Sequence, residues 1–176
     1  STICIREDIS GGTIIMRIAI LTANTEIYRE QEEDKAGKVI REIVEAAGHQ
    51  VVFAKALPLD KKVLSTIMQR MADGQMADLI LTTGGAGLAQ GDCTPEATLE
   101  VVDREIRGIP EAMRAYSMTI TKRAMLSRST AGIRKKTLII NLPGSPKAVK
   151  ESLEYIIDAL GHGIEIMTGE AGNCAR

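Results

Sequence analysis

A stretch rich in glycine, threonine and acidic residues follows the apolar run at residues 79–81. Three glycines within four positions, Gly84, Gly85 and Gly87, let the backbone turn sharply and approach a ligand without an intervening Cβ atom. The free amide groups of such a loop form a concavity that binds anions. Asp92 then supplies a carboxylate that could join a divalent metal ion to a bound phosphate. The alternative is a plain tight turn with a solvated aspartate.

The residues after Asp92 predict the start of a helix. Thr94 is expected to be the N-cap, Pro95 occupies the first helical position, and Glu96 places an acid in the first turn. The positive end of this helix would point back at the glycine loop, which begins directly after Thr83. The helix start therefore adds support for a phosphate site, and the plain turn stays open as the alternative.

A second strand-to-helix turn has the sequence Asn141-Leu-Pro143-Gly144-Ser145-Pro-Lys147. Gly144 permits unusual backbone angles, and Ser145 can cap the helix that follows. Lys147 can meet an anion as a point charge. An ordinary helix start with a solvent-facing lysine is the alternative.

Two further charged positions bear on the site or on the fold around it. Ser127 and Arg128 can form a second anion clamp, because a guanidinium group stays charged and contacts a phosphate at two points. A surface arginine is the alternative. Asp60 follows the second predicted strand and could cap the next helix.

Alternating strand and helix patterns predict the elements that must position these residues. Strands are expected at residues 17–22, 50–54, 78–83 and 137–141. Helices are expected at residues 34–47, 61–73, 95–104, 110–117 and 145–160. This order predicts an α/β fold, a three-layer sandwich in which helices flank a mostly parallel sheet. Because ligands bind beyond the carboxyl ends of parallel strands, three loops should meet at one edge, residues 22–34, 82–94 and 141–147.

The expected domain organisation is a single domain at residues 16–176, preceded by a short N-terminal hairpin at residues 1–15. The hairpin would pair residues 3–5 with residues 13–15 around a Ser-Gly-Gly turn at residues 10–12. No motif indicates its role.

The bulk composition excludes several classes of protein. The 176 residues are 44% hydrophobic and 26% charged, with a net charge of −1, so no overall field attracts nucleic acid or an acidic membrane. Only 2% are aromatic, which leaves few stacking platforms for single-stranded nucleic acid. No stretch approaches the length of a membrane span, and charged residues interrupt any early apolar run at residues 6–8.

The cysteines favour a reduced, cytoplasmic protein. Three cysteines and two histidines lie far apart and show no metal-ligand spacing, which argues against a structural zinc site. Cys93, next to Asp92, is either a reactive thiol or a small residue that fills a crowded loop. The second interpretation is favoured.

Four motifs in this order resemble the MogA/MoaB family of molybdenum-cofactor biosynthesis, the molybdopterin adenylyltransferases. The resemblance extends from about residue 17 to about residue 165. Its motifs are the glycine loop with Asp92 and residues 94–98, the pair Glu111 and Arg114, residues 124–128 with Gly132, and residues 141–147.

The resemblance implies nucleotidyl transfer, in which Mg-ATP and molybdopterin give adenylylated molybdopterin and pyrophosphate. It implies that Asp92 and Asp60 are the catalytic carboxylates and hold Mg²⁺ against the phosphates. It also implies a homotrimer or hexamer, with a molybdenum-insertion enzyme as a partner. The residues that it assigns to nucleotide or pterin binding are Thr83, Gly84, Gly85, Gly87, Thr94, Glu96, Ser127, Arg128, Asn141, Pro143, Gly144, Ser145 and Lys147.

The chain departs from the family pattern at several positions. Residues 22–25 replace a usual Ser-Asp-Arg, Ala86 replaces a threonine, and Gly91 replaces an arginine. Asp60 is displaced by one position, whereas the Asp-Lys-x-Gly at residues 34–37 is retained. Loss of a hydroxyl and a cation weakens anion binding, which keeps a second function open, a catalytically weak or inactive molybdopterin-binding protein of the same fold. A nucleotide hydrolase that shares the glycine loop is a third.

Overall fold

A six-stranded sheet forms the middle layer of the computed structural model, which describes residues 14–169. In chain order its strands are β1 (Arg17–Ala23), β2 (Gln50–Leu57), β3 (Leu79–Thr83), β4 (Arg104–Glu105), β5 (Ala131–Arg134) and β6 (Thr137–Leu142). They lie side by side in the order β2-β1-β3-β6-β5-β4. Strands β2, β1, β3 and β6 run parallel to one another. At one side of the sheet, β5 pairs antiparallel with β6, and β4 pairs antiparallel with β5. The expected mostly parallel sheet is confirmed.

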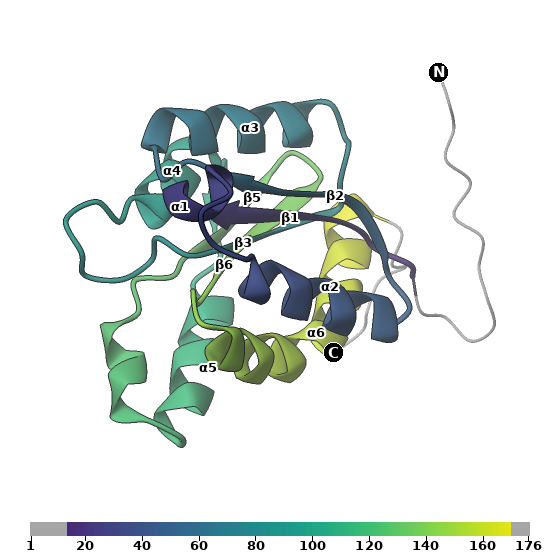
Figure 1. Cartoon of the computed structure of the whole chain (residues 1–176). Helices are drawn as coiled ribbons and strands as arrows, with labels where there is room; N and C mark the ends of the chain where they lie inside the picture. The colour runs from purple at the N-terminus through teal and green to yellow at the C-terminus, as the bar shows by residue number, and fades with distance from the viewer. Residues whose placement is uncertain (1–13, 170–176) are drawn as a thin grey trace.

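Helices cover both faces of this sheet (Figure 1). They are α1 (Thr25–Tyr28), α2 (Lys35–Ala46), α3 (Lys61–Asp73), α4 (Thr94–Val101), α5 (Gly108–Met118) and α6 (Pro146–Thr168), together with a short 3-10 helix, η1 (Lys122–Leu126). Helices α2, α5 and α6 pack on one face, and α3 and α4 pack on the other. This arrangement confirms the expected three-layer α/β sandwich.

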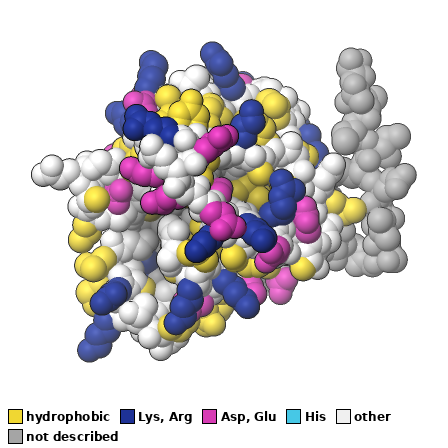
Figure 2. All heavy atoms as spheres, in the orientation of Figure 1, with side chains coloured by type: hydrophobic (Ala, Val, Ile, Leu, Met, Phe, Trp, Pro, Cys, Tyr) yellow, Lys and Arg dark blue, Asp and Glu magenta, His cyan; other side chains and the backbone are white. Residues whose placement is uncertain are grey.

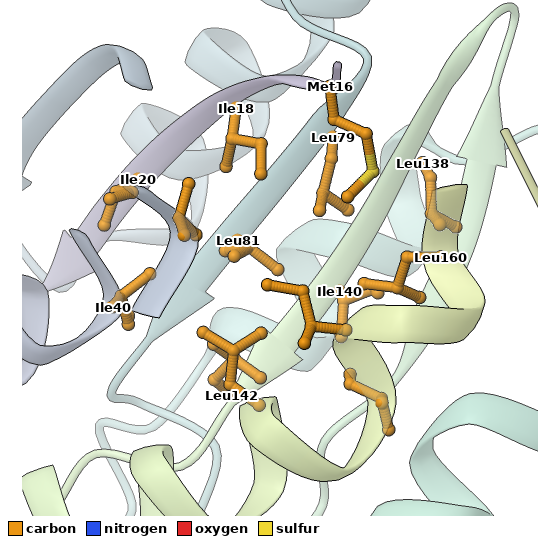
Figure 3. Packing of buried hydrophobic residues seen from close by; sticks show 14 of the residues in the cluster. Met16, Ile18, Ile20, Ile40, Leu79, Leu81, Leu138, Ile140, Leu142 and Leu160 are labelled. Atoms are coloured by element: carbon orange, nitrogen blue, oxygen red, sulfur yellow. The ribbon is translucent and has the colours of Figure 1, made fainter. Parts of the chain in front are cut away.

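Two apolar cores lie on opposite faces of the sheet because consecutive strand residues point to opposite sides. On the face covered by α2, α5 and α6, strand residues such as Ile20, Leu81 and Ile140 are almost completely buried (Figure 3). On the other face, Leu21 and Ile80 pack against α3 and α4. The central strands are therefore apolar at nearly every position, as expected for parallel strands covered on both sides.

The parallel strands place their carboxyl ends at one edge of the sheet. Figure 1 shows that α1, the long loop after β3 and the N-terminal end of α4 lie at this edge. The turn between β6 and α6 joins them there, because β6 lies parallel to β3. The topology therefore brings together the three loops that were expected to meet.

Several element bounds differ from the sequence predictions. Helix α4 ends at Val101 rather than near residue 104, because the chain turns extended at Val102 and then forms β4. Helix α6 runs beyond Gly161 to Thr168, because its buried face continues through Gly161 to Ile164. Strands β4 and β5 and helices α1 and η1 were not predicted, and each of them is five residues long or shorter.

The predicted N-terminal hairpin falls largely on residues 1–13, which lie outside the described residues. Its last two residues, Ile14 and Ile15, belong to no strand, and Ile14 packs against the core beside α6. Within residues 14–169, no helix has both the length and the apolar character needed to cross a membrane.

Candidate functional site

The glycine loop after β3 adopts a backbone that side chains rarely tolerate. Gly84 and Gly85 have φ angles of +89° and +70°. A Cβ atom at Gly84 would lie 2.7 Å from the carbonyl oxygen of Ala23, and one at Gly85 would overlap Oγ1 of Thr94. The loop therefore requires glycine at both positions, for its angles and for its close packing.

Thr94 fastens this loop and does not cap α4, so the predicted N-cap was wrong. The N-cap position is Cys93, whose side chain makes no capping hydrogen bond. The hydroxyl of Thr94 instead donates to the carbonyl oxygen of Gly84 over 2.9 Å, and its amide donates to the carbonyl oxygen of Gly85 over 3.1 Å. Thr94 is completely buried, and its two hydrogen bonds fix the position of the loop.

The glycine loop has two arms, residues 84–87 and residues 91–92. Asp92 lies on the second arm and is half-buried. Its Oδ2 accepts a hydrogen bond from the amide of Gly87 over 2.9 Å. A Cβ atom at Gly87 would lie at the same distance, 2.9 Å, from this oxygen, which shows how closely the two arms approach. The carboxylate is therefore oriented by the loop that carries it.

The turn after β6 is tied to the glycine loop. Asn141 is completely buried, and its Nδ2 donates to the hydroxyls of Thr82 and Thr98 over 2.9 Å each. The hydroxyl of Thr83 donates to the carbonyl oxygen of Pro143 over 2.5 Å. Asn141 and Thr83 thus hold the two strand ends together, and neither side chain is a freely exposed ligand.

The remaining residues of this turn begin α6. The hydroxyl of Ser145 caps the helix by accepting from the amide of Ala148 over 3.2 Å. Lys147 is exposed and lines neither of the two cavities described below. Gly144 packs against the backbone of Gly84, so the two turns meet directly.

Two cavities open on either side of this junction, and Gly85, Asp92 and Gly144 line both of them. The first has a volume of about 470 Å³ and extends over α5, η1 and the start of α6. Its other walls include Met113, Arg114 and Ser127. The expected meeting of the 82–94 and 141–147 loops is therefore confirmed, since Asp92 and Gly144 line the same cavities.

The second cavity has a volume of about 600 Å³ and lies between the glycine loop and the loop after β1. In addition to Asp92, its polar lining contains three glutamates and a lysine and comes mainly from the segment between β1 and the start of α2: Asn24, Thr25, Glu26, Glu32, Glu33 and Lys35. Figure 2 shows acidic and basic side chains interspersed over this face of the molecule, with no broad surface of one charge.

Residues of α5 and η1 that line the first cavity were given no role from the sequence. Arg114 and Arg123 bring cations to its wall, and Nη1 of Arg114 donates to the carbonyl oxygen of Ser129 over 2.8 Å. The motif containing Arg114 was recognised, but it lacks the glycines that marked the other loops. Nothing in the sequence marked Arg123.

All three guanidinium nitrogens of Arg128 donate hydrogen bonds to the protein. Arg128 lines neither cavity, and its partners are the backbone of the glycine loop and the carboxylate of Glu96. Ser127, its neighbour, lines the first cavity, and its hydroxyl donates to the hydroxyl of Ser129 over 3.1 Å.

Asp60 caps α3, as one of its two interpretations proposed. Its Oδ1 accepts from the amide of Val63 over 3.0 Å. Asp60 lines neither of the two cavities. Burial, together with the charges of Glu96, Asp60 and Asp92, raises the pKa of the Cys93 thiol. A thiol with a raised pKa that packs against the core fits the favoured interpretation of Cys93 as a filling residue.

Within residues 14–169, no group of three or more histidine, cysteine, aspartate or glutamate residues could hold a metal ion. Asp92 and Asp60 alone do not make a closed site. Mg²⁺, however, is commonly bound by one or two carboxylates together with substrate phosphates. Of the two predicted ligands, Asp92 lines both cavities and Asp60 lines neither, so Asp92 is the one placed to meet a metal ion that arrives with substrate phosphates.

Comparison with known proteins agrees with this architecture. Residues 19–162 match a family model described as "Probable molybdopterin binding domain". The molybdopterin adenylyltransferase of Helicobacter pylori strain J99 is 36% identical over 156 residues, which cover 88% of this chain and 89% of that relative. The enzyme of the same name from Escherichia coli K12 is 44% identical over 114 residues, which cover 62% and 58% of the two chains.

Solved structures agree as well. The molybdopterin biosynthesis enzyme MoaB from Thermus thermophilus superposes with a TM-score of 0.83 at 41% identity, covering 88% of this chain and 98% of that one. The Mog protein from Mycobacterium ulcerans gives a TM-score of 0.81 at 32% identity over the same shares of the two chains. With these matches over most of its length, the chain belongs to the MogA/MoaB family of molybdopterin-binding domains.

Proposed function

We propose that the protein is a molybdopterin adenylyltransferase, which transfers AMP from Mg-ATP to molybdopterin in molybdenum-cofactor biosynthesis. The observation that carries this proposal is the position of Asp92, whose carboxylate lies where two cavities meet beside the glycine loop. A transfer between two substrates needs both of them held next to each other in a reactive geometry. The names of the relatives support the same reaction.

In this proposal each cavity takes one substrate. The first cavity has apolar walls from α5 with the hydroxyls of Ser127 and Ser145, which suits a pterin ring system with polar edges. The second cavity, with Asn24, Thr25 and Lys35, takes the nucleotide, whose phosphates reach Gly84 and Gly85 at the boundary. Lys147, exposed at the start of α6 and outside the lining of both cavities, would meet only an anionic part of a substrate that extends beyond them.

The reaction forms one bond and breaks another at the α-phosphorus of ATP. A phosphate oxygen of molybdopterin attacks this phosphorus, and the bond to the bridging oxygen breaks to release pyrophosphate. Such chemistry depends on alignment and on neutralisation of charge more than on a strong base. Asp92, oriented by the Gly87 amide, and Asp60, whose Oδ1 caps α3, are the proposed carboxylates. Bound Mg²⁺ would neutralise phosphate charge.

The direct test measures pyrophosphate release by purified protein with Mg-ATP and molybdopterin. Asp92→Asn should lower turnover at least 100-fold while the free energy of unfolding stays nearly unchanged, because the amide oxygen can still accept from Gly87. Asp103→Asn is the matched control, since Oδ2 of Asp103 also accepts a backbone amide, that of Lys135, over 2.8 Å but far from both cavities. Full turnover by Asp92→Asn would refute the carboxylate role.

Two outcomes would point to another function. Molybdopterin binding in calorimetry without pyrophosphate release would identify a binding protein of the same fold. Release of phosphate from ATP alone would identify a nucleotide hydrolase. Adenylylated molybdopterin as the product, identified by mass spectrometry, is the result that only the proposed transferase gives.

The cellular setting follows from the same proposal. An enzyme that consumes ATP and molybdopterin acts in the cytoplasm, and it hands its product to a molybdenum-insertion enzyme. We propose a homotrimer or a hexamer in solution. Light scattering coupled to size exclusion chromatography would give a mass near three or six times the 19.0 kDa chain.

A further inference from the structure

Arg128 donates hydrogen bonds to both arms of the glycine loop. Its Nε donates to the carbonyl oxygen of Gly87 over 2.6 Å, and its Nη2 donates to the carbonyl oxygen of Asp92 over 2.9 Å. Its backbone amide donates to the carbonyl oxygen of Ala86 over 2.8 Å. The side chain therefore contacts the residue that carries the central carboxylate and the residue that orients it.

The contacts form a closed ring around the loop. Arg128 holds the carbonyl of Gly87, the amide of Gly87 donates to Oδ2 of Asp92, and Arg128 also holds the carbonyl of Asp92. A shift of either arm would break a hydrogen bond in this ring. The position of the Asp92 carboxylate is thus coupled to the guanidinium group.

Glu96 completes the arrangement by pairing with Nη1 of Arg128. The pair joins the first turn of α4 to the loop. Partial burial opposes ionisation of Glu96, but the hydrogen bond and charge of Arg128 outweigh it and lower the pKa of this carboxyl. Glu96 therefore stays charged and offsets the charge of Arg128 beside the site.

We infer that Arg128 is a positioning residue, which together with Glu96 fixes the loop so that Asp92 points into the junction of the two cavities. This inference rests on the proposed function and changes the role that the family resemblance implied, since Arg128 faces neither cavity and its donors are used on the protein. Glu96 acts with it and does not bind the substrate.

Arg134 provides a matched control, because it holds the other end of α4 in a similar way. Its Nη1 donates to the carbonyl oxygen of Val101 over 2.8 Å, and its Nε and Nη2 donate to the carboxylate of Asp73 over 2.9 and 3.1 Å. It lies outside the lining of both cavities. Loss of Arg134 should therefore affect stability alone.

The test separates kcat from KM in pyrophosphate release. Arg128→Ala should lower kcat about 30-fold or more, because small displacements of reacting groups reduce rates by up to about 100-fold. The KM values for ATP and molybdopterin should change less than threefold. Arg134→Ala should leave both parameters near wild type. A raised KM with an unchanged kcat in Arg128→Ala would overturn the inference, since it would show direct substrate binding.

Chemical rescue and two further variants distinguish loss of the Arg128 contacts from misfolding of the protein. Added guanidinium ion should restore part of kcat in Arg128→Ala, whereas ammonium ion should not. Glu96→Gln should lower kcat less than Arg128→Ala does, and the double variant should be no slower than Arg128→Ala, because the two residues act as one unit. Additive losses of kcat, or no rescue by guanidinium, would contradict the proposed ring.

Failure of the proposed function is recognised separately. If the wild-type protein releases no pyrophosphate, amide hydrogen exchange still tests the ring. The Gly87 amide, which donates to Asp92, should exchange at least tenfold faster in Arg128→Ala than in wild type or Arg134→Ala. Unchanged exchange of this amide would overturn the positioning role whatever the reaction.

Discussion

The hydroxyl of Thr83 donates a hydrogen bond of 2.5 Å to the carbonyl oxygen of Pro143, which ties the end of β3 to the turn after β6. These two residues lie 60 positions apart in the chain, and Pro143 lines the first cavity whereas Thr83 lines the second. Because Thr83 is only 1% exposed, water cannot easily replace its side chain. The relative position of the two turns therefore depends on this contact.

Thr83→Val should lower both stability and activity. The change removes the donor and leaves the carbonyl of Pro143 without this partner, at a cost of about 1 kcal/mol in the free energy of unfolding. Thr137→Val is the matched control, since Thr137 is equally buried on β6 and donates to the carbonyl oxygen of Ala77 over 2.8 Å at the opposite end of the sheet.

Chemical denaturation and pyrophosphate release would compare the two threonine variants. Both should lose similar stability, but only Thr83→Val should lower kcat/KM, by about tenfold. Equal activity in both variants would show that the contact between β3 and the Pro143 turn does not position the site.

Gly84→Ala should disrupt the site through the backbone. Gly84 has a φ of +89°, and the added Cβ would meet the carbonyl oxygen of Ala23 at 2.7 Å, so no side-chain rotation relieves the clash. A loss of about 1–3 kcal/mol in stability is expected, with a larger loss in activity. Gly108→Ala should be silent, because a Cβ at Gly108 meets no atom within 4 Å and Gly108 lines neither cavity. Similar activities of the two variants would refute this prediction.

The sheet and the meeting of its loops could be predicted from the sequence because apolar strands such as residues 79–81 and the turn glycines carry strong local signals. The role of Thr94 could not be predicted. Its place before Pro95 is typical of an N-cap. Its hydroxyl and amide instead donate hydrogen bonds to the carbonyl oxygens of Gly84 and Gly85. Such a choice depends on tertiary contacts that no local pattern contains.

The same limit applies to Arg128 and α6. The motif around Arg128 indicated an anion clamp, but the partners of its guanidinium group come from residues 87, 92 and 96, which only the fold brings near. Gly161 is typical of a helix end, but it lies on the buried face of α6, where packing continues to Ile164. Tertiary packing outweighed local preference in both cases.

Asp60→Ser separates the two roles of Asp60. Serine caps a helix about as well as aspartate, so the free energy of unfolding should change by only a few tenths of a kcal/mol, whereas Asp60→Ala should cost about 1 kcal/mol. If the carboxylate also helps to hold Mg²⁺, Asp60→Ser should need a severalfold higher Mg²⁺ concentration for half-maximal turnover. An unchanged Mg²⁺ dependence would assign Asp60 to capping alone.

His49 should make stability depend on pH at the edge of the sheet opposite the site. Its Nδ1 accepts from the amide of Met16 over 3.1 Å, so protonation of this nitrogen would place two donors against each other. Burial lowers the pKa of His49 below 6.5, and the charge of Asp158 only partly opposes this effect. The unfolded chain therefore binds a proton at a higher pH than the folded chain does.

The sign follows from this difference in proton binding. The contribution of His49 to stability is complete above about pH 6.5 and is lost as the pH falls through the lower pKa of the folded state. The slope cannot exceed about 1.4 kcal/mol per pH unit for one proton. Asp73 and Glu96 have lowered carboxyl pKa values, so their contributions to stability are lost at more acidic pH than that of His49.

Urea denaturation between pH 5 and pH 7 would measure the effect of His49. His49→Asn should retain stability at pH 7, because the amide oxygen can accept from Met16, and should lose less stability than wild type at pH 5. His162→Asn is the control for loss of a histidine that does not accept from Met16, since the His162 side chain lies 58% exposed on α6. The same slope in His49→Asn and wild type would exclude His49 as the group that titrates, because asparagine binds no proton in this range.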